Sequence, residues 1–242
     1  MIQSTDITRQ LPLAWPSYIA GEPVQTDDTL EVRYPWDGSL TGTLPRITPG
    51  QLEQAIQAAL GQAQPPTRSE RYEILMRARE LLAGRADEFA NLIRLEAGLC
   101  MRETRYEVGR AQEVFKFAAA EALRDDESIF SCDAAKNGPA RKIFTLREPL
   151  SLVAAITPFN HPLNLIVHQV APAVATGCPC IVKPAEATPL SAMRFVGILR
   201  EAGLPEEWCQ GLVTTDLDVA GSLATDGRVG FFSFIGSARV GW

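Results

Sequence analysis

The chain has 242 residues, of which 46% are hydrophobic and 21% charged, an ordinary balance for a globular protein with a buried core. The formal net charge of −6 gives no reason to expect nucleic acid or an anionic membrane surface as a partner. No apolar run approaches the roughly 20 residues that cross a bilayer, and the N-terminus lacks the basic start and apolar core of a secretory signal.

The N-terminal part, residues 1–124, is predicted to hold short hairpins followed by helices. Residues 1–17 lack periodicity and are expected to form an extended arm, whereas residues 18–24 predict a hairpin with Gly21 in its turn. Two further short strands are expected at 30–34 and 40–44.

Local signals mark several helix ends in this part. Thr48 as an N-cap and Pro49 at the first helical position predict where the first helix begins, and Gly98 is expected to end the third. The many Glu and Arg residues are expected to form solvated faces with i,i+4 pairs. The predicted helices lie at about 49–60, 69–85, 87–97 and 101–123.

Residues 125–150 are expected to project from the body as a flap. Their first part is polar and contains Asn137-Gly138, a turn signal. Residues 141–148 alternate apolar and polar side chains, which indicates a strand.

Residues 151–242 alternate strands and helices. A strand at 152–156, a helix at 163–176 stopped by Gly177, and a strand at 180–182 predict a parallel βαβ unit. The alternation predicts an α/β fold with a doubly wound parallel sheet. The later elements are expected as a helix at 189–202, a strand at 211–215, a short helix at 219–224, a strand at 231–235 and a helix opened by Gly236 and Ser237.

The five cysteines and two histidines do not suggest a metal site. The cysteines are odd in number and irregularly spaced, and the closest two, Cys178 and Cys180, form C-x-C rather than C-x-x-C. We expect reduced, mostly buried thiols in a cytoplasmic protein.

Asn160 lies where a parallel sheet would place a ligand, beyond the carboxyl end of a strand, in the turn TPFNHP at 157–162. Its amide could stabilise oxygen charge that develops on a carbonyl. Asparagine in a turn more often bonds its own backbone, and that alternative stays open.

Lys183 and Glu186 end the second strand in the motif KPAE. An ammonium donates three hydrogen bonds and a carboxylate only accepts, so the pair suits ribose hydroxyls. Glu186 would repel a 2′-phosphate, which favours NAD over NADP. The alternative for these residues is a surface ion pair.

Gly236 and Ser237 precede a helix N-terminus, where free N–H groups and the helix dipole favour a phosphate. A plain strand-to-helix turn is the alternative.

These three motifs, in this order, resemble those of the aldehyde dehydrogenase superfamily, and the resemblance covers nearly the whole chain. It implies the superfamily's cofactor domain in incomplete form, a flap that serves homo-oligomerisation, and an aldehyde substrate. Asn160 is implied to form an oxyanion hole with a backbone N–H. The residues implied to bind the cofactor are Ile156, Thr157, Pro158, Phe159, Lys183, Ala185, Glu186, Gly221, Gly236, Ser237 and Val240.

Three further segments, NHPLN, REPL and GSARVGW, resemble the phosphonoacetaldehyde-dehydrogenase-like branch of that superfamily. This resemblance implies that His161 and Arg110 contact the phosphonate of the substrate. A turn histidine, and a helix-surface ion pair of Arg110 with Glu107 or Glu113, are the alternatives. His168, in the middle of a predicted helix, is assigned to packing.

The resemblance also implies what these residues lack. The superfamily's nucleophilic cysteine attacks the aldehyde and its glutamate activates water, and both are expected beyond residue 242. We therefore expect weak NAD binding at best and no turnover from this chain alone. The apolar strand at 231–235 is expected to be covered on both faces.

Two other classes of function stay open at this point. One is a non-catalytic nucleotide- or partner-binding module that associates through residues 141–148. The other is a short-chain reductase, but the sequence lacks its glycine-rich first turn and its Tyr-x-x-x-Lys pair.

Overall fold

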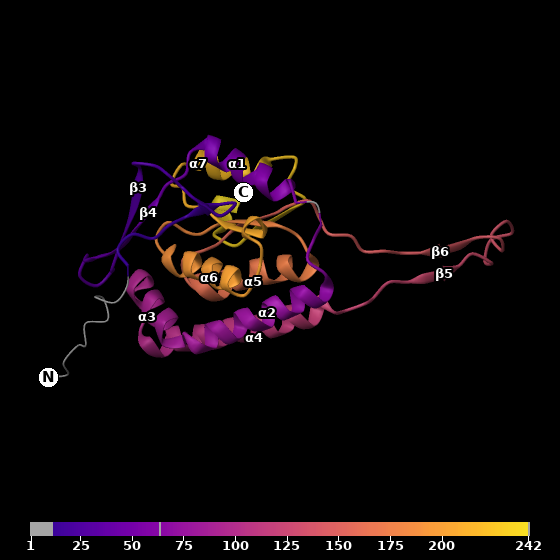
Figure 1. The fold of residues 1–242 in the computed structure, drawn as a ribbon, viewed down its shortest axis with the longest axis horizontal. Coiled ribbons are helices and arrows are strands. Elements are labelled where there is room, and N and C mark those ends of the chain that lie inside the picture. The colour runs from indigo at the N-terminus through magenta and orange to yellow at the C-terminus, as the bar shows by residue number, and fades with distance from the viewer. Residues whose placement is uncertain (1–11, 63, 242) are drawn as a thin grey trace.

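The structure is a computed structural model that describes residues 12–62 and 64–241. Most of the arm expected at 1–17 therefore lies outside the described residues. Four short strands and four helices come first, and from residue 153 onward strands and helices alternate and build the predicted α/β fold (Figure 1). Among the described helices, none combines the length and apolarity that crossing a membrane requires.

The N-terminal hairpins form as predicted. β1 (Tyr18–Ile19) pairs antiparallel with β2 (Glu22–Pro23), and Gly21 has a φ of +86°, which glycine adopts without strain. β3 (Thr29–Arg33) and β4 (Leu40–Pro45) make a second antiparallel pair.

The helix ends follow the expected local chemistry. The Thr48 side chain accepts from the Gln51 N–H while the Gln51 side chain accepts from the Thr48 N–H, so a capping box begins the first helix. Gly98 ends the third helix with a φ of +71°. The helices are α1 (Pro49–Leu60), α2 (Arg68–Gly84), α3 (Ala86–Ala97) and α4 (Met101–Ala122).

The main sheet has four parallel strands in the order β10-β7-β8-β9. Sequential strands are joined by helices, as parallel pairing requires. The elements are β7 (Val153–Ile156), α5 (Pro162–Thr176), β8 (Cys180–Lys183), α6 (Leu190–Glu201), a 3₁₀ turn (Glu206–Trp208), β9 (Cys209–Gly211), α7 (Leu217–Thr225), β10 (Phe231–Phe234) and α8 (Ala238–Gly241).

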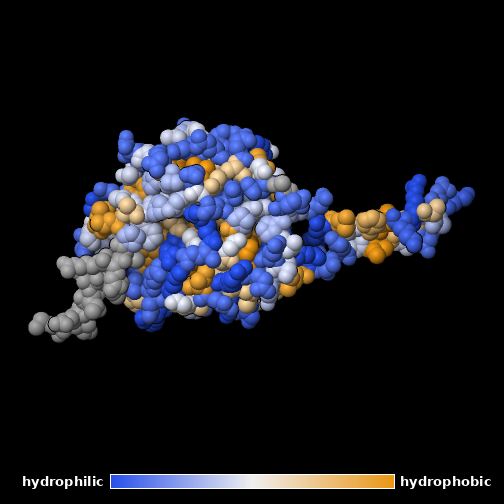
Figure 2. Space-filling model, in the orientation of Figure 1, coloured by the Kyte–Doolittle hydropathy of each residue, from blue (hydrophilic) through white to orange (hydrophobic). Residues whose placement is uncertain are grey.

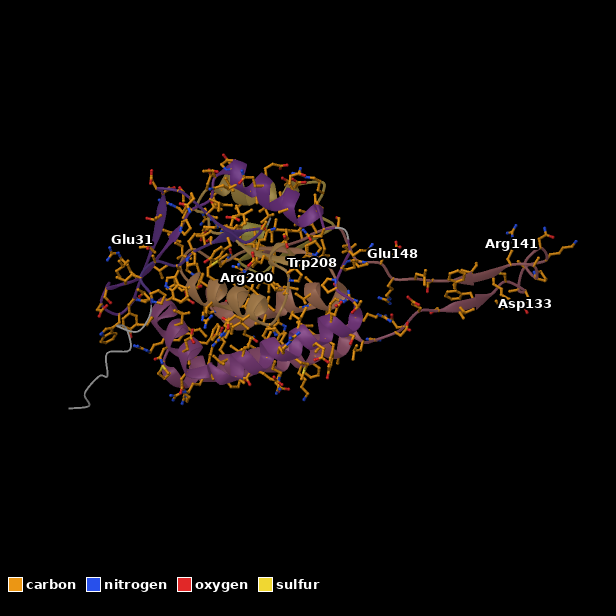
Figure 3. The ribbon with its side chains drawn as sticks, viewed as in Figure 1. Glu31, Asp133, Arg141, Glu148, Arg200 and Trp208 are labelled. Carbon is orange, nitrogen blue, oxygen red and sulfur yellow. The ribbon has the colours of Figure 1, made fainter. Side chains whose placement is uncertain are left out.

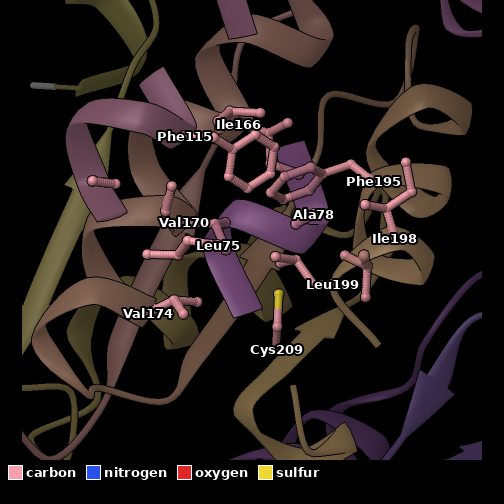
Figure 4. Packing of buried hydrophobic residues seen from close by; sticks show 14 of the residues in the cluster. Leu75, Ala78, Phe115, Ile166, Val170, Val174, Phe195, Ile198, Leu199 and Cys209 are labelled. Carbon is pink, nitrogen blue, oxygen red and sulfur yellow. The ribbon is translucent and has the colours of Figure 1, made fainter. Parts of the chain in front are cut away.

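Helices cover both faces of this sheet, which confirms the doubly wound architecture (Figure 1). Ala154 packs with α1 and α7, whereas its neighbours Val153 and Ala155 pack with α5 and α6. α2 and α4 pack on the side of α5 and α6 that faces away from the sheet, and the four helices share one core (Figure 1). In that core the rings of Phe115 and Phe195 lie 5.8 Å apart (Figure 4).

The third strand of the βαβ series lies earlier than predicted. The sequence predicts a strand at 211–215, but β9 is Cys209–Gly211. Leu212 and Val213 are apolar because two cores bury them, one beneath α1 and one beside Trp15 and Leu44. Apolarity alone therefore misplaced the strand.

The apolar pattern at 231–235 is typical of a strand covered on both faces, but the described residues leave this strand partly exposed. β10 is an edge of the sheet, with Phe231 55% and Phe232 37% exposed. Such an apolar edge is a site where further polypeptide can pair.

The flap projects from the body as predicted, but its strands differ from the expectation (Figure 1). β6 (Lys142–Phe144) is shorter than the predicted strand, and it pairs antiparallel with β5 (Ile129–Ser131), which the sequence did not predict. Asp133 and Arg141 mark the far end of the flap (Figure 3). Apolar side chains are exposed along it (Figure 2).

Candidate functional site at the carboxyl edge of the sheet

The carboxyl ends of three strands meet at one edge of the sheet. Ile156 of β7 stands in register with Lys183 of β8 on one side and Phe234 of β10 on the other. The ladder continues one residue beyond the strands, since Thr157 N–H donates to the Lys183 carbonyl and Ile235 N–H to the Ile156 carbonyl, each at 3.1 Å. The structure therefore brings the segments that carry Asn160, Lys183 and Gly236 to one edge, which we call the rim.

The turn after β7 is open to solvent at its tip. Thr157 is buried, Pro158 is half-buried, and Phe159 is 65% exposed. Asn160 is also exposed, and its side chain makes no hydrogen bond to the described residues. Within the described residues, the hydrogen bond that the turn alternative requires is therefore not present, and the amide is exposed to solvent.

Lys183 is buried at the end of β8, only 7% exposed. Its Nζ donates to Glu186 Oε1 at 2.5 Å and to the Pro184 carbonyl at 3.3 Å. Thr188 lies two residues beyond Glu186, and its buried Oγ1 has no hydrogen-bond partner within the described part of the chain. A buried ammonium is not the ordinary surface ion pair, because its desolvation costs free energy that an exposed pair avoids.

The bend after β10 is tight. A Cβ at Gly236 would lie 2.4 Å from the Phe234 ring, so a larger residue would displace that ring. Ser237 and Val240 are exposed, and α8 is a single turn that starts at Ala238. Gly221 is different, since a Cβ there would meet nothing within 4 Å, so packing does not require glycine on α7.

His161 and Arg110 belong to two helices that pack against each other, α5 and α4. His161 is the N-cap of α5 and its Nδ1 lies 3.5 Å from Glu107 Oε2 on α4, while Arg110 is exposed one turn further along α4. The proposed partners of Arg110 are engaged elsewhere, since Glu113 pairs with Lys116 at 3.6 Å and Glu107 faces His161.

The assignment of His168 to packing is wrong. His168 is exposed on α5, on the same face as His161 seven residues earlier. Partial desolvation and, second, the positive charge of Arg110 lower the pKa of His168. Helical position alone does not tell which face of α5 meets the core.

Two buried polar residues at the rim were missed by sequence reasoning. Glu107, 2% exposed, accepts hydrogen bonds from the N–H groups of Leu163 and Asn164, and Gln169 donates to the carbonyls of Ile156 and Ser233. A signal existed for Glu107, which shares the inward stripe of α4 with Val108 and Ala111, but its partner on α5 is visible only in the fold.

The buried thiols lie away from the rim and are poor nucleophiles. Cys180 begins β8 and Cys209 begins β9, so both lie toward the amino ends of the strands. Burial raises the pKa of Cys180 and raises that of Cys209 to about 12. Cys178 accepts from the Leu150 N–H at 3.2 Å. Thiolate is the reactive form of cysteine, so none of these three suits covalent catalysis.

A cavity of about 760 Å³ lies elsewhere, between the N-terminal segment, α3 and α6. Trp15, Tyr18 and Arg194 are among its lining residues, and none of the rim residues lines it. The cavity and the polar side chains that follow the strands therefore indicate two different candidate sites. We favour the rim as the functional site, because the polar side chains gather there.

Residues 23–242 match the sequence model of the aldehyde dehydrogenase family. A 3-sulfolactaldehyde dehydrogenase from Priestia aryabhattai is 36% identical over 226 residues, which cover 93% of this chain and 47% of the relative. An NAD-dependent aldehyde dehydrogenase from Sinorhizobium meliloti has a similar structure, with a TM-score of 0.90, 27% identity and coverage of 99% of this chain and 48% of that one.

An NADP-dependent glyceraldehyde-3-phosphate dehydrogenase from Bacillus halodurans C-125, solved with NADP, has a TM-score of 0.89 and 28% identity, over 95% of this chain and 50% of that one. The chain thus spans about half the length of the relatives it matches.

Proposed function

Because the chain belongs to the aldehyde dehydrogenase family, we propose that it forms the cofactor-binding half of an enzyme that oxidises an aldehyde to a carboxylic acid with NAD(P). The observation that carries this proposal is the register of Ile156, Lys183 and Phe234, which gathers three polar turns at one edge. In parallel α/β sheets, that edge is where ligands bind.

Asn160 is the residue that would act on the aldehyde. Its exposed amide can donate a hydrogen bond to the carbonyl oxygen as negative charge develops there. Gln169 stabilises the base of this turn, because its side chain donates to the carbonyls of Ile156 on β7 and Ser233 on β10. The position of the amide then does not depend on the turn alone.

Lys183 and Glu186 fit the ribose of a dinucleotide, because the ammonium donor and the carboxylate acceptor lie in contact with each other at the rim. The cofactor, when bound, supplies the hydride acceptor for the reaction. Glu186 would repel a 2′-phosphate, so we propose NAD over NADP, although relatives of both kinds are known. Thr188 Oγ1 is a further donor without a partner among the described residues.

The remaining cofactor contacts follow from the same placement. Residues 156–159 would face the nicotinamide, and the bend at Gly236 and Ser237, with Val240, would face the pyrophosphate. Gly221, with open space around it, is the weakest of these assignments and would lie beneath the adenine.

The substrate is proposed to be an aldehyde that carries an anionic group. His161 follows Asn160 directly and Arg110 lies on α4, one turn beyond the glutamate that His161 contacts, and a guanidinium and a protonated imidazole both bind oxyanions. Two of the relatives act on 3-sulfolactaldehyde and glyceraldehyde 3-phosphate, which are anionic aldehydes. Phosphonoacetaldehyde is one aldehyde of this class.

The test is a titration of the chain with NADH, followed by its fluorescence. Lys183→Met keeps the apolar stem and removes the ammonium, and we expect at least a roughly tenfold rise in Kd, about 1.4 kcal/mol. Asn160→Ala is the matched control and should leave Kd unchanged, because the amide faces the aldehyde rather than the ribose. Equal affinity of wild type and Lys183→Met would contradict the proposal.

A turnover assay tests whether the chain can catalyse the reaction as well as bind the cofactor. We expect no NADH from this chain alone with an anionic aldehyde, because burial raises the pKa of Cys180 and Cys209 and both lie away from the rim. NADH production that Asn160→Ala abolishes would show instead that the chain holds a complete active site.

A second function, binding of a partner chain, is favoured by the flap. Apolar side chains on both of its strands are exposed, and no element of the described chain covers them: Ile129 83%, Phe130 51%, Ile143 53% and Phe144 68%. We propose that a second copy of the chain covers this surface.

A further inference from the structure

Glu107 is a buried carboxylate that belongs to none of the motifs. Glu107 lies on α4 with its side chain only 1% exposed, and it faces the start of α5. Burial raises its pKa, but hydrogen bonds from backbone N–H groups act in the opposite direction. A carboxylate in such a place must have partners for both oxygens, or its burial is costly.

One oxygen of Glu107 serves as the cap of α5. Oε1 accepts from the N–H groups of Leu163 and Asn164 at 2.9 and 3.0 Å. His161, the N-cap residue, makes no side-chain cap of its own, so the neighbouring helix supplies the acceptor that an N-cap side chain would normally supply.

The second oxygen points at the imidazole. Oε2 makes no hydrogen bond to the described residues, and His161 Nδ1 lies 3.5 Å from it, so a small shift of the half-exposed ring completes a hydrogen bond. Because the ionised carboxylate only accepts, the hydrogen bond requires that Nδ1 carries the proton. Nε2 is then left for a ligand.

We propose that Glu107 is a positioning residue for the rim: Oε1 anchors the first turn of α5, and Oε2 holds His161 by Nδ1–H so that Nε2 serves the substrate. In the protonated ring Nε2–H donates to an anion while Nδ1–H stays on Glu107. The inference rests on the proposed function for the role of Nε2, but the contact itself does not.

Glu96 provides a matched comparison within the same chain. It lies on α3, is 2% exposed, and caps α6 by accepting from the N–H groups of Leu190 and Ser191 at 2.6 and 3.1 Å. Unlike Glu107, it forms no ion-pair contact with a histidine among the described residues. A variant at Glu96 therefore perturbs a helix cap without touching His161.

The test is the tautomer of His161, read from long-range ¹H–¹⁵N correlation spectra of the histidine-labelled chain. Only two histidines are present, and a His168→Gln variant assigns their signals. The spectra are recorded at about pH 8.5, above the ordinary histidine pKa of about 6.5, so that the rings are neutral. We expect His161 to carry its proton on Nδ1 in the wild-type chain.

Glu107→Gln should switch His161 to the Nε2–H tautomer. The carboxamide oxygen stays on the backbone N–H groups, so its NH₂ turns toward Nδ1, which must then accept. Glu96→Gln should leave the Nδ1–H tautomer in place, which separates the contact from a general effect of a weakened cap.

Two results would overturn the inference: an Nε2–H tautomer in the wild-type chain, or an Nδ1–H tautomer that survives Glu107→Gln. The wild-type spectrum decides the matter even where Glu107→Gln fails to fold. The measurement needs neither cofactor nor aldehyde, so a failure of the proposed function, seen in the NADH titration, remains distinct from a failure of this inference.

Discussion

The sheet body and the flap of this protein use apolar residues in opposite ways. In the body, Phe195 is 1% exposed and packs against Phe115 (Figure 4), whereas in the flap Phe144 is 68% exposed and belongs to a two-stranded ribbon. A two-stranded ribbon has no second layer to cover its side chains. The body therefore buries its large apolar side chains in a packed core, whereas the flap presents them where no described residue covers them.

The largest expected effect is in the body. Phe195→Ala should lower the free energy of unfolding by about 3–5 kcal/mol, because it removes a fully buried ring and leaves a cavity. Phe144→Ala is the matched control in the flap and should change it by less than about 0.5 kcal/mol. Urea denaturation of the wild type and the two variants measures both changes in the free energy of unfolding. Equal changes in the two variants would contradict the distinction between the regions.

A smaller effect within the body concerns pH. Burial raises the pKa of Glu96 from 4.5 to about 8, so the folded chain holds a proton that the unfolded chain has released. Stability from this group is complete below pH 4.5 and is lost as the pH rises toward 8. The slope is 1.4 kcal/mol per pH unit at most.

Glu96→Gln removes this titration, and the stability of the variant should depend less on pH between 5.5 and 7.5. Urea denaturation across that range checks the slope. The exposed Glu121 gives the control variant Glu121→Gln, which should keep the wild-type slope. An unchanged slope in Glu96→Gln would mean that this carboxyl is charged in the folded chain.

The smallest expected effect on the free energy of unfolding is in the flap. A substitution there should instead change the association of the chain. Phe144→Asp should leave the free energy of unfolding within about 0.5 kcal/mol of wild type, because the ring is already in solvent. If a second copy covers the flap, the new charge should abolish discrete oligomers in native mass spectrometry. Oligomers that persist in Phe144→Asp would place the interface elsewhere.

Much of the fold could be predicted, because the decisive signals are local. Thr48 and Gly98 mark helix ends through their own hydrogen bonds and backbone angles, and they work wherever the helix lies. The β7–α5–β8 unit followed from its pattern of apolar runs and from Gly177. The division of the chain at 124 and 150 stays a prediction, since α4 and α5 share one core.

The site was predicted only in part. The sequence indicated Asn160, Lys183 and Gly236 as residues that follow strands, but it could not state the register that aligns β7, β8 and β10. It missed β5, because three residues of a ribbon carry little signal, and it misplaced β9, because burial and strand pairing both favour apolar residues.

The sequence by itself determined the alternation of elements, the helix caps and the polar turns, because each depends on neighbours a few residues away. Tertiary structure alone decided that Glu107 reaches the start of α5, that His168 is exposed to solvent, and that β10 is an edge strand. These facts depend on how helices and strands distant in sequence pack together, and a buried carboxylate or an exposed phenylalanine has no local signature that reveals its partner.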